Sequence, residues 1–194
     1  MYLYIIAGCN GAGKATASFS ILPEMLDCKE FVNADEIARG ISPFRPEEVS
    51  LEAGRIMLNR INELLKGNQN FAFETTLSTK SHKNRIFEAK EKGFNTILIF
   101  FWLQSIKLAK ERVKVRVQEG GHDVDPILIE RWYKKGIINL FDIYLPIIDE
   151  ALIIDNSSGK PVLIAEKSET GDLHVTDADR FNKLKRIYEN LSSK

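Results

Sequence analysis

The sequence has few cysteine and histidine residues, and both shortages exclude classes of protein. The two cysteines, Cys9 and Cys28, are too few for the disulfide framework of a small secreted domain. Three histidines, with the cysteines far apart, offer no spacing typical of a zinc site. We therefore expect a reducing, cytoplasmic location.

An excess of charge and a long apolar run are absent as well. Basic and acidic residues number 27 each, which removes the electrostatic case for bulk binding of nucleic acid or of a membrane surface. No apolar run approaches the roughly 20 residues that cross a bilayer, and the first residues carry no charged segment of a secretory signal. We therefore expect that the protein binds neither nucleic acid nor a membrane. A local basic groove is the one alternative that the balanced charge leaves open.

The most informative segment is a glycine-rich turn between an apolar strand candidate, Tyr2–Ala7, and a helix candidate, Thr16–Leu22. Gly8, Gly13 and Lys14 match the pattern G-x-x-x-x-G-K, in which backbone N–H groups surround phosphate oxygens and the lysine reaches the outer phosphates. The alternative is a flexible glycine turn with a surface lysine. The residues expected to bind phosphate are Gly8, Cys9, Asn10, Gly11, Ala12, Gly13, Lys14, Ala15 and Thr16.

Strand and helix candidates alternate along the rest of the chain. Strands are expected at 30–33, 70–73, 95–102 and 151–155, and helices at 34–40, 49–65, 81–92, 105–118 and 127–140. This alternation predicts an α/β fold with a doubly wound parallel sheet and right-handed crossovers. We expect Pro23 to end or kink the first helix and Gly40 to end the second.

The last part of the chain has a different pattern. Residues 161–167 and 172–175 are expected to form an antiparallel pair, followed by a helix over 177–191. We expect one domain over 1–194, with a P-loop core at 1–157 and a hairpin-plus-helix appendage at 158–194.

Polar residues follow two of the expected strands, at the sheet edge where ligands bind in open α/β folds. Asp35 is the candidate general base, because a carboxylate there can accept the proton of an acceptor hydroxyl. The alternative is a helix cap beside Asn33. Glu74, before Thr75 and Thr76, is a candidate for holding a metal-bound water or an acceptor hydroxyl, and its alternative is a solvated turn residue.

Arg112, Arg116 and Arg131 flank a polar, glycine-rich loop at 119–124. Arginines on such a lid can close over a nucleotide and neutralise the charge of phosphoryl transfer, or else form a solvated helix face. His122 is favoured as an ordinary loop residue over a lid contact. The aromatic residues nearby are expected to pack in the core rather than stack on a base: Trp102, Trp132 and Tyr133.

Taken together, several segments resemble the zeta-toxin-like P-loop kinases, in consistent order over residues 3 to 157. The segments that carry the resemblance are Ala7–Lys14, Asn33–Arg39, Glu74–Ser78, Arg116–Val124 with Arg131, and Asp155–Ser157. The resemblance implies a sheet of about five strands in the order 2-3-1-4-5 and ATP or GTP as phosphoryl donor. It also implies an acceptor such as UDP-N-acetylglucosamine and a possible antitoxin-like protein partner.

The resemblance also implies roles for single residues. Lys14 would bind the outer phosphates, Asp35 would be the base, and Arg116 and Arg131 would clamp the phosphates. Arg112 is placed with the nucleotide. The acceptor would meet Asn33, Glu74, Thr75 and Thr76.

Ala15 departs from the pattern, which normally continues with Ser or Thr as a ligand of the nucleotide's Mg²⁺. Thr16 lies about 100° further around the helix and cannot simply replace that hydroxyl. No direct protein ligand for Mg²⁺ is therefore predicted, and the ion would be held by nucleotide and water. Two functions stay open: a small-molecule kinase, and a nucleotide-binding switch or pseudo-enzyme with poor phosphoryl transfer. A nucleic-acid-acting ATPase is disfavoured by the balanced charge.

Overall fold

A computed structural model gives the fold and describes residues 1–121 and 123–193. His122, weighed above as a loop residue, lies outside this part of the chain. The strands are β1 (Tyr2–Gly8), β2 (Glu30–Val32), β3 (Phe71–Thr75), β4 (Asn95–Trp102), β5 (Glu150–Asp155), β6 (Val162–Lys167) and β7 (Leu173–Val175). The helices are α1 (Lys14–Met25), α2 (Ala34–Ile41), η1 (Pro46–Val49), α3 (Ser50–Leu64), α4 (His82–Glu91), α5 (Ile106–Gln118), α6 (Pro126–Asn139), η2 (Leu140–Tyr144), α7 (Leu145–Ile147) and α8 (Ala178–Ser192).

The described strands form one sheet in the order β2-β3-β1-β4-β5-β6-β7. The first five are parallel, which confirms the expected order 2-3-1-4-5. The hairpin expected as an appendage continues this sheet, because β6 pairs antiparallel with β5, and β7 with β6. The doubly wound α/β prediction therefore holds, and the sheet is two strands wider than its parallel core.

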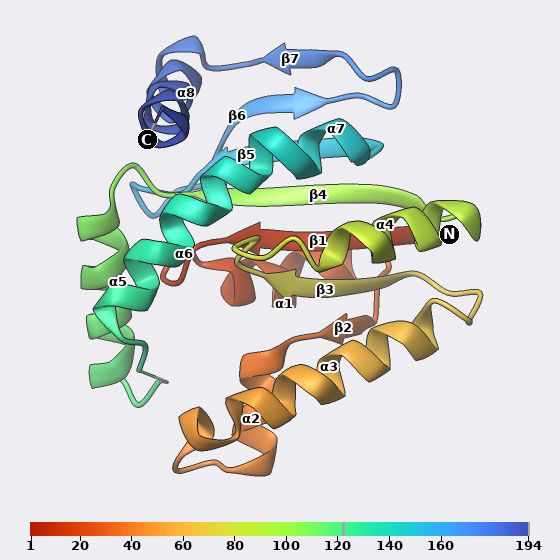
Figure 1. The fold of residues 1–194 in the computed structure, drawn as a ribbon, viewed down its shortest axis with the longest axis vertical. Helices are drawn as coiled ribbons and strands as arrows, with labels where there is room; N and C mark the ends of the chain where they lie inside the picture. Colours follow the sequence, from red (N-terminus) through yellow and green to blue (C-terminus); the bar gives the residue numbers. More distant parts are fainter. Residues whose placement is uncertain (122, 194) are drawn as a thin grey trace.

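Helices lie on both faces of the sheet, but unequally (Figure 1). In this view α3, α4 and α6 lie in front of the sheet, α1 lies behind it near β1 and β3, and α5 stands beyond the strands' carboxyl ends. The central strand β1 is buried along nearly its whole length, as expected for a parallel strand covered on both faces. This arrangement leaves the carboxyl edge of the sheet open for the loops that follow β1, β3 and β5.

Some helix ends differ from the expectations. Helix α1 continues two residues beyond Pro23 and ends at Met25. The proline is tolerated there, since its missing N–H costs only one helical hydrogen bond close to the end of the helix. Helix α2 includes Gly40 and ends at Ile41, so glycine does not mark its end. The helix expected at 127–140 is prolonged by the π-helical turn η2 and by α7, where Pro146 occupies the first turn. Within the described residues, none of the helices is long and apolar enough to cross a membrane.

Candidate active site

The loop between β1 and α1 has a backbone that requires glycine. Gly8, Gly11 and Gly13 have φ values of 140°, 78° and 84°, which L side chains rarely adopt. A Cβ atom at Gly8 would lie 2.2 Å from the carbonyl oxygen of Phe101, and one at Gly11 2.8 Å from that of Ala109. Since α1 begins at Lys14, the N–H groups at its N-terminus, which have no acceptor within a helix, lie at the loop. This is the geometry that surrounds a phosphate group.

Lys14 is 6% exposed, and its ammonium is held by two groups. Its Nζ donates to the carbonyl oxygen of Cys9 at 3.1 Å and lies 3.2 Å from Oε1 of Glu74. The other oxygen of Glu74 accepts from Nδ2 of Asn33 at 2.9 Å. Because a buried charge needs a partner, Glu74 balances Lys14 when no anion is bound. The alternative of a solvated turn for Glu74 is therefore wrong: the residue lies inside β3 and is 13% exposed.

Asn33 connects this charged pair to helix α2. Its Oδ1 accepts from the N–H groups of Asp35 and Glu36, so Asn33 is the N-cap and Asp35 is a residue of the first turn. The alternative of Asp35 as the cap is therefore wrong. Its carboxylate remains exposed at the site.

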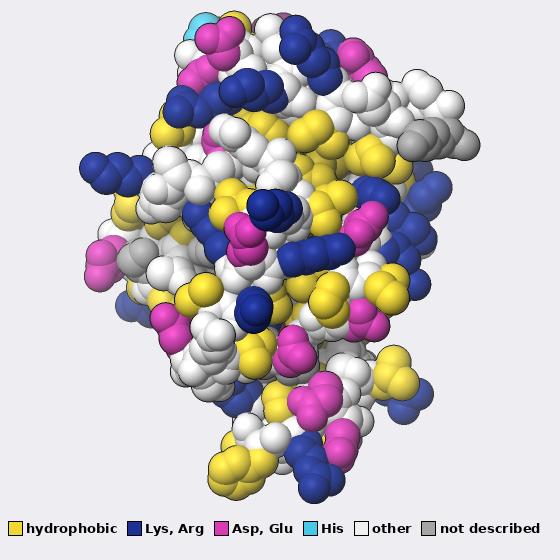
Figure 2. Space-filling view, turned by 90° about the vertical axis from the view of Figure 1, so that its left-hand side faces the viewer, with side chains coloured by type: hydrophobic (Ala, Val, Ile, Leu, Met, Phe, Trp, Pro, Cys, Tyr) yellow, Lys and Arg dark blue, Asp and Glu magenta, His cyan; other side chains and the backbone are white. Residues whose placement is uncertain are grey.

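A cavity of about 360 Å³ opens above the phosphate loop. Its walls carry four cationic and four acidic side chains, at Lys14, Arg39, Arg112, Arg116, Asp35, Glu36, Glu74 and Glu119. Arg112 and Arg116 come from α5, on the side that Figure 2 shows with Lys and Arg side chains gathered across its middle. Cations around a glycine-rich loop suit a polyphosphate.

A second cavity of about 240 Å³ adjoins the first. The two share Asn10, Lys14, Asn33, Asp35 and Glu74, so these residues form the border between them. The second cavity is otherwise lined by Ala34 of α2, by polar residues at the end of β3 and in the turn after it, and by side chains from α3, α4 and α6: Thr75, Thr76, Ser78, Thr79, Met57, His82 and Trp132. A molecule in this cavity would meet the phosphate end of a nucleotide in the first.

The turn after β3 is held in a strained shape by distant residues. Leu77 is fully buried and has φ of 54°, which is uncommon for a residue other than glycine. Its carbonyl oxygen accepts from Nδ2 of Asn139 at 2.6 Å, and that of Thr79 accepts from the hydroxyl of Tyr144 at 2.6 Å. Residues near the end of α6 and in η2 therefore shape this wall of the second cavity.

Two buried polar atoms at these cavities have no hydrogen-bond partner within the described ranges. They are Oδ1 of Asn10 and Nδ1 of His82, whose residues are 8% and 7% exposed. Burial, with a smaller contribution from Arg85, lowers the pKa of His82 to about 4, so its imidazole is neutral at pH 7. Buried polar atoms are rarely left unpaired, and these two are placed to bind a polar ligand.

A second polar cluster lies beside the loop, at the carboxyl end of β5. Asp155 is 3% exposed. Its oxygens accept from Ser157 and from Nε2 of Gln104 at 2.9 Å, and Oδ2 lies 3.2 Å from Nε of Arg180 in an ion pair. Arg112 donates to the carbonyl oxygens of Ser157 and of the phosphate loop. Helix α8 is thus joined to the loop through Asp155, Ser157 and Arg112.

Asn156 makes the closest link to the phosphate loop. Its Nδ2 donates to the carbonyl oxygen of Ala12 at 2.8 Å and would lie 2.6 Å from a Cβ atom at Gly13. Its Oδ1 is buried and has no partner among the described residues. The segment after β5 therefore fixes one side of the loop.

The structure brings most of the sequence-predicted site residues together. Beside the border residues, the first cavity is lined by Gly11, Gly13, Ala15, Thr16, Arg112 and Arg116. Gly8, Cys9 and Ala12 form the loop behind it, and burial raises the pKa of the Cys9 thiol to about 11, which keeps it protonated. Arg131 is exposed on α6 and lines neither cavity.

Some residues of the site carry no signal in the sequence. Met57 and His82 lie in helices with ordinary periodicity, so no local signal marks them. The sequence predicts that Trp132 packs in the core like Trp102 and Tyr133, and it does pack against the core, although it is only partly buried. Its additional place in the wall of the second cavity has no signal in the sequence.

Comparison with solved structures defines the fold class. A structure of the AvrRxo1-ORF1:-ORF2 complex with ATP superposes with a TM-score of 0.73 at 16% identity, over 94% of this chain and 63% of that chain. The chain thus spans less than two thirds of that protein's length. A structure of the PezAT chromosomal toxin-antitoxin system of Streptococcus pneumoniae has a TM-score of 0.61 at 14% identity, over 100% of this chain and 88% of that chain. The fold is that of the P-loop kinases.

The family follows from the sequence match. Residues 2–169 match the family described as zeta toxin, and the chain belongs to that family. A relative from Haemophilus influenzae, described as an uncharacterized protein, is 32% identical over 128 residues, which are 65% of this chain and 88% of the relative. The resemblance of the sequence to zeta-toxin-like P-loop kinases is therefore confirmed.

Proposed function

We propose that the protein transfers the γ-phosphoryl group of ATP or GTP to a hydroxyl group of a small molecule. One observation carries this proposal: the phosphate-loop cavity and the second cavity adjoin, and Lys14, Asp35 and Glu74 line both. A donor in the first and an acceptor in the second would meet at these three side chains. Membership in the zeta toxin family supports the same reaction class.

Each residue at the border has a distinct part in this reaction. When the nucleotide binds, the ammonium of Lys14 leaves Glu74 and pairs with the outer phosphates, while the loop N–H groups hold the phosphate oxygens. Asp35 accepts the proton of the acceptor hydroxyl as the new P–O bond forms and the nucleoside diphosphate leaves. Arg112 and Arg116 balance the negative charge from the α5 side. Arg131 lines neither cavity, so its proposed part as a phosphate clamp requires that α6 come closer.

Mg²⁺ bound to the nucleotide would neutralise part of the phosphate charge. The carboxylates of Asp35, Glu36 and Glu74 line the first cavity and suit a hydrated ion, whereas Ala15 offers no oxygen ligand. Within the described part of the chain, no group of three or more His, Cys, Asp or Glu residues could hold a metal ion by itself. The residues therefore fit Mg²⁺ held through nucleotide and water.

A nucleotide sugar such as UDP-N-acetylglucosamine is the acceptor class that we propose. The second cavity offers the hydroxyls of Thr75, Thr76, Ser78 and Thr79 together with the aromatic ring of Trp132. Hydroxyl groups and an aromatic face suit a polar, ring-shaped molecule. The resemblance to zeta-toxin-like kinases supports the same choice.

A phosphoryl-transfer screen tests this function. The chain is incubated with Mg²⁺ and ATP or GTP, and UDP-sugars, nucleosides and small metabolites are offered as acceptors. We expect Asp35→Asn to lower kcat by about 10²- to 10⁴-fold because a positioned base is lost. The matched control is Glu52→Gln, an exposed carboxylate on α3 that lines neither cavity, which should change kcat far less. Unchanged turnover in Asp35→Asn, with nucleotide still bound, would show that the mechanism is wrong.

A nucleotide-binding switch is the second candidate, and Ala15 is the observation that favours it. The residue lines the phosphate cavity but lacks the hydroxyl that normally ligates Mg²⁺. If this loss limits the chain, Ala15→Ser should raise the Mg²⁺-dependent turnover by about tenfold or more and change nucleotide affinity little. Equal rates in both forms would show that the missing hydroxyl does not limit transfer.

We further propose an antitoxin-like protein as a partner. Two structural neighbours are described as a complex of two open-reading-frame products and as a toxin-antitoxin system. Co-expression of the chain with the product of an adjacent gene, followed by size-exclusion chromatography, tests this. A stable complex with reduced nucleotide binding is expected, and two separate peaks with full binding would contradict the proposal.

A further inference from the structure

The sheet face on the α1 side is only half covered. Helix α1 packs near β1 and β3, and Figure 1 shows no helix behind β4, β5 and β6, within the described ranges. Parallel strands such as β4 and β5 usually have both faces covered, because both carry apolar side chains. An antiparallel sheet can expose one face to solvent, whereas parallel strands are usually buried on both faces. The uncovered half is therefore a candidate surface for binding a partner.

The uncovered face carries an apolar floor. Ile97 and Leu152 are partly exposed, whereas their strand neighbours Leu98 and Ala151 are fully buried on the opposite face. The register places Ile99, which is 3% exposed, beside Leu152, so the apolar side chains adjoin across β4 and β5 and the exposed part of the floor is formed by Ile97 and Leu152. Together with Tyr4 and Leu26 they line a cavity of about 470 Å³.

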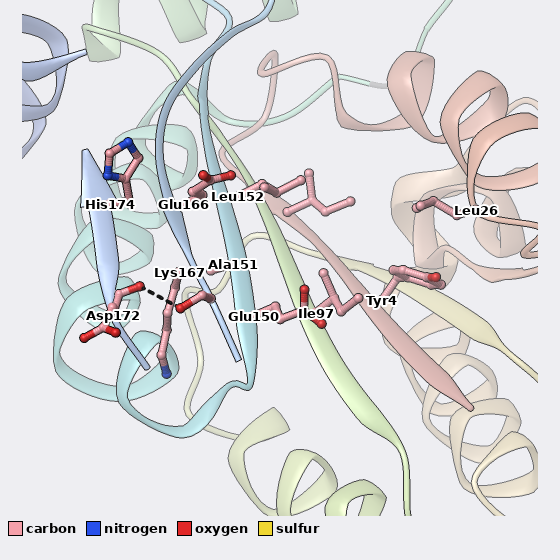
Figure 3. A pocket seen from close by; sticks show the side chains of 12 residues that line it. Tyr4, Leu26, Ile97, Glu150, Ala151, Leu152, Glu166, Lys167, Asp172 and His174 are labelled. Carbon is pink, nitrogen blue, oxygen red and sulfur yellow. Dashed lines mark hydrogen bonds between the residues drawn. The ribbon is translucent and has the colours of Figure 1, made fainter. Parts of the chain in front are cut away.

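The rim of this cavity is acidic. Glu150, Glu166 and Asp172 line it, and Figure 3 shows Glu166, Asp172 and His174 on the β6–β7 side of the apolar residues. The neighbouring Lys167 does not neutralise them, because its Nζ donates to the carbonyl oxygens of Leu145 and Ile148. We define the acidic-rimmed face as the apolar floor of Ile97, Ile99 and Leu152 with the carboxylates of Glu150, Glu166 and Asp172.

The dimensions of this face suit one helix. Adjacent strands lie about 4.8 Å apart, so the outer strands of β4–β6 are separated by about 10 Å. An α-helix with its side chains has a diameter of about 10 Å and packs lengthwise on such a width. We propose that the acidic-rimmed face docks one amphipathic helix of a partner protein, with its apolar stripe on the floor and Lys or Arg side chains facing the three carboxylates.

A second copy of this chain suits the face less well. In a two-fold dimer the same patch meets itself, which would bring Glu150, Glu166 and Asp172 toward their own copies. The basic amphipathic helix α8 is not free to dock, because Phe181 and Leu184 on its apolar side are buried within the molecule. Charge complementarity therefore favours a different chain, and this inference does not depend on the proposed phosphoryl transfer.

Binding of two designed peptides to the full chain tests the proposal. Both are 18-residue amphipathic helices with the same leucine stripe, and one carries lysine where the other carries glutamate. Fluorescence anisotropy of labelled peptide should show at least tenfold tighter binding of the lysine peptide. The double variant Glu150→Lys, Glu166→Lys should reverse this preference. The matched control is Glu88→Lys, Glu91→Lys on α4, which should leave it unchanged.

Three results would overturn the proposal. Equal binding of both peptides would show that the carboxylates do not select the partner. A preference unchanged by the Glu150 and Glu166 replacements would place the peptide elsewhere. Sedimentation that shows a dimer of the chain, converted to monomer by Leu152→Asp with an unchanged thermal unfolding midpoint, would assign the face to a second copy.

Discussion

Two polar clusters lie at the carboxyl edge of the same sheet, and they differ in how fully their atoms are paired. Around Asp155, both carboxylate oxygens accept hydrogen bonds and one meets an arginine, although the residue is almost completely buried. Around Lys14, the ammonium is shared between Glu74 and a loop carbonyl, while Oδ1 of the neighbouring Asn10 has no partner among the described residues.

This difference separates residues that hold the site in place from residues that bind a ligand. A fully paired buried group has nothing to gain from a ligand, so the Asp155 cluster serves to hold α8 and the loop after β5 in place. An incompletely paired group gains hydrogen bonds when a ligand arrives. We therefore assign binding to the Lys14 cluster and support to the Asp155 cluster, and this assignment predicts very different effects of mutation.

The largest effect is expected at Lys14. Lys14→Met should lower kcat/KM for phosphoryl transfer by about 10³-fold, because the cation over the outer phosphates is lost. It should also lower stability, since Glu74 keeps only Asn33 as a described partner. Steady-state kinetics and thermal unfolding measure the two effects.

A double variant separates these two losses. Lys14→Met with Glu74→Gln should regain much of the stability and none of the activity, because the unpaired buried charge is gone. The control Lys134→Met removes a partly exposed lysine that pairs with Glu130 on α6 and should change little. Activity close to that of the unchanged chain in Lys14→Met would end the assignment of binding to this cluster.

An intermediate effect is expected at His82, which lines the second cavity. Its pKa is about 4 in the folded chain against an ordinary value of 6.5, so the unfolded chain binds more protons between these values. Stability should therefore fall as the pH drops from about 6.5 to about 4, by about 3 kcal/mol from this residue. Urea unfolding of the chain and of His82→Phe as a function of pH measures it. An identical pH dependence in the two proteins would contradict the lowered pKa.

The smallest effect is expected around Asp155, whose carboxylate is fully paired. Arg180→Gln removes one partner of Asp155, which keeps Ser157 and Gln104, and should cost about 1–2 kcal/mol of stability. We expect kcat to stay within twofold and the KM for nucleotide to rise a few-fold, because Arg112 and the loop are positioned through this cluster. Arg186→Gln, elsewhere on α8, is the control. A hundredfold loss of kcat in Arg180→Gln would erase the distinction between the two clusters.

The sequence predicts those parts of the site that depend on local patterns. The loop Gly8–Lys14 needs glycines at fixed spacing, and Asn33 and Glu74 follow from their places at strand ends. Their meeting follows from the parallel sheet, whose strand order the family resemblance implied. Arg180 could not be predicted in this way, because its partner Asp155 lies 25 residues earlier in the chain and no spacing rule joins them.

Other features could not be predicted from the sequence, because they also depend on contacts between distant segments. The strained backbone at Leu77 depends on Asn139, which holds its carbonyl oxygen from another helix. The continuation of α6 into η2 follows from packing that a periodicity cannot express. The role of Arg131 stays a prediction, since the described geometry leaves it outside both cavities.

The hydrogen bond from Asn156 to the carbonyl oxygen of Ala12 joins residues 144 positions apart. Contacts of such long range form late, because the chain between them must first be ordered. The phosphate loop therefore receives its final shape only when β5, which comes much later in the chain, has joined the sheet. In refolding experiments, nucleotide binding should recover with the slowest phase, which makes it a reporter of completed folding.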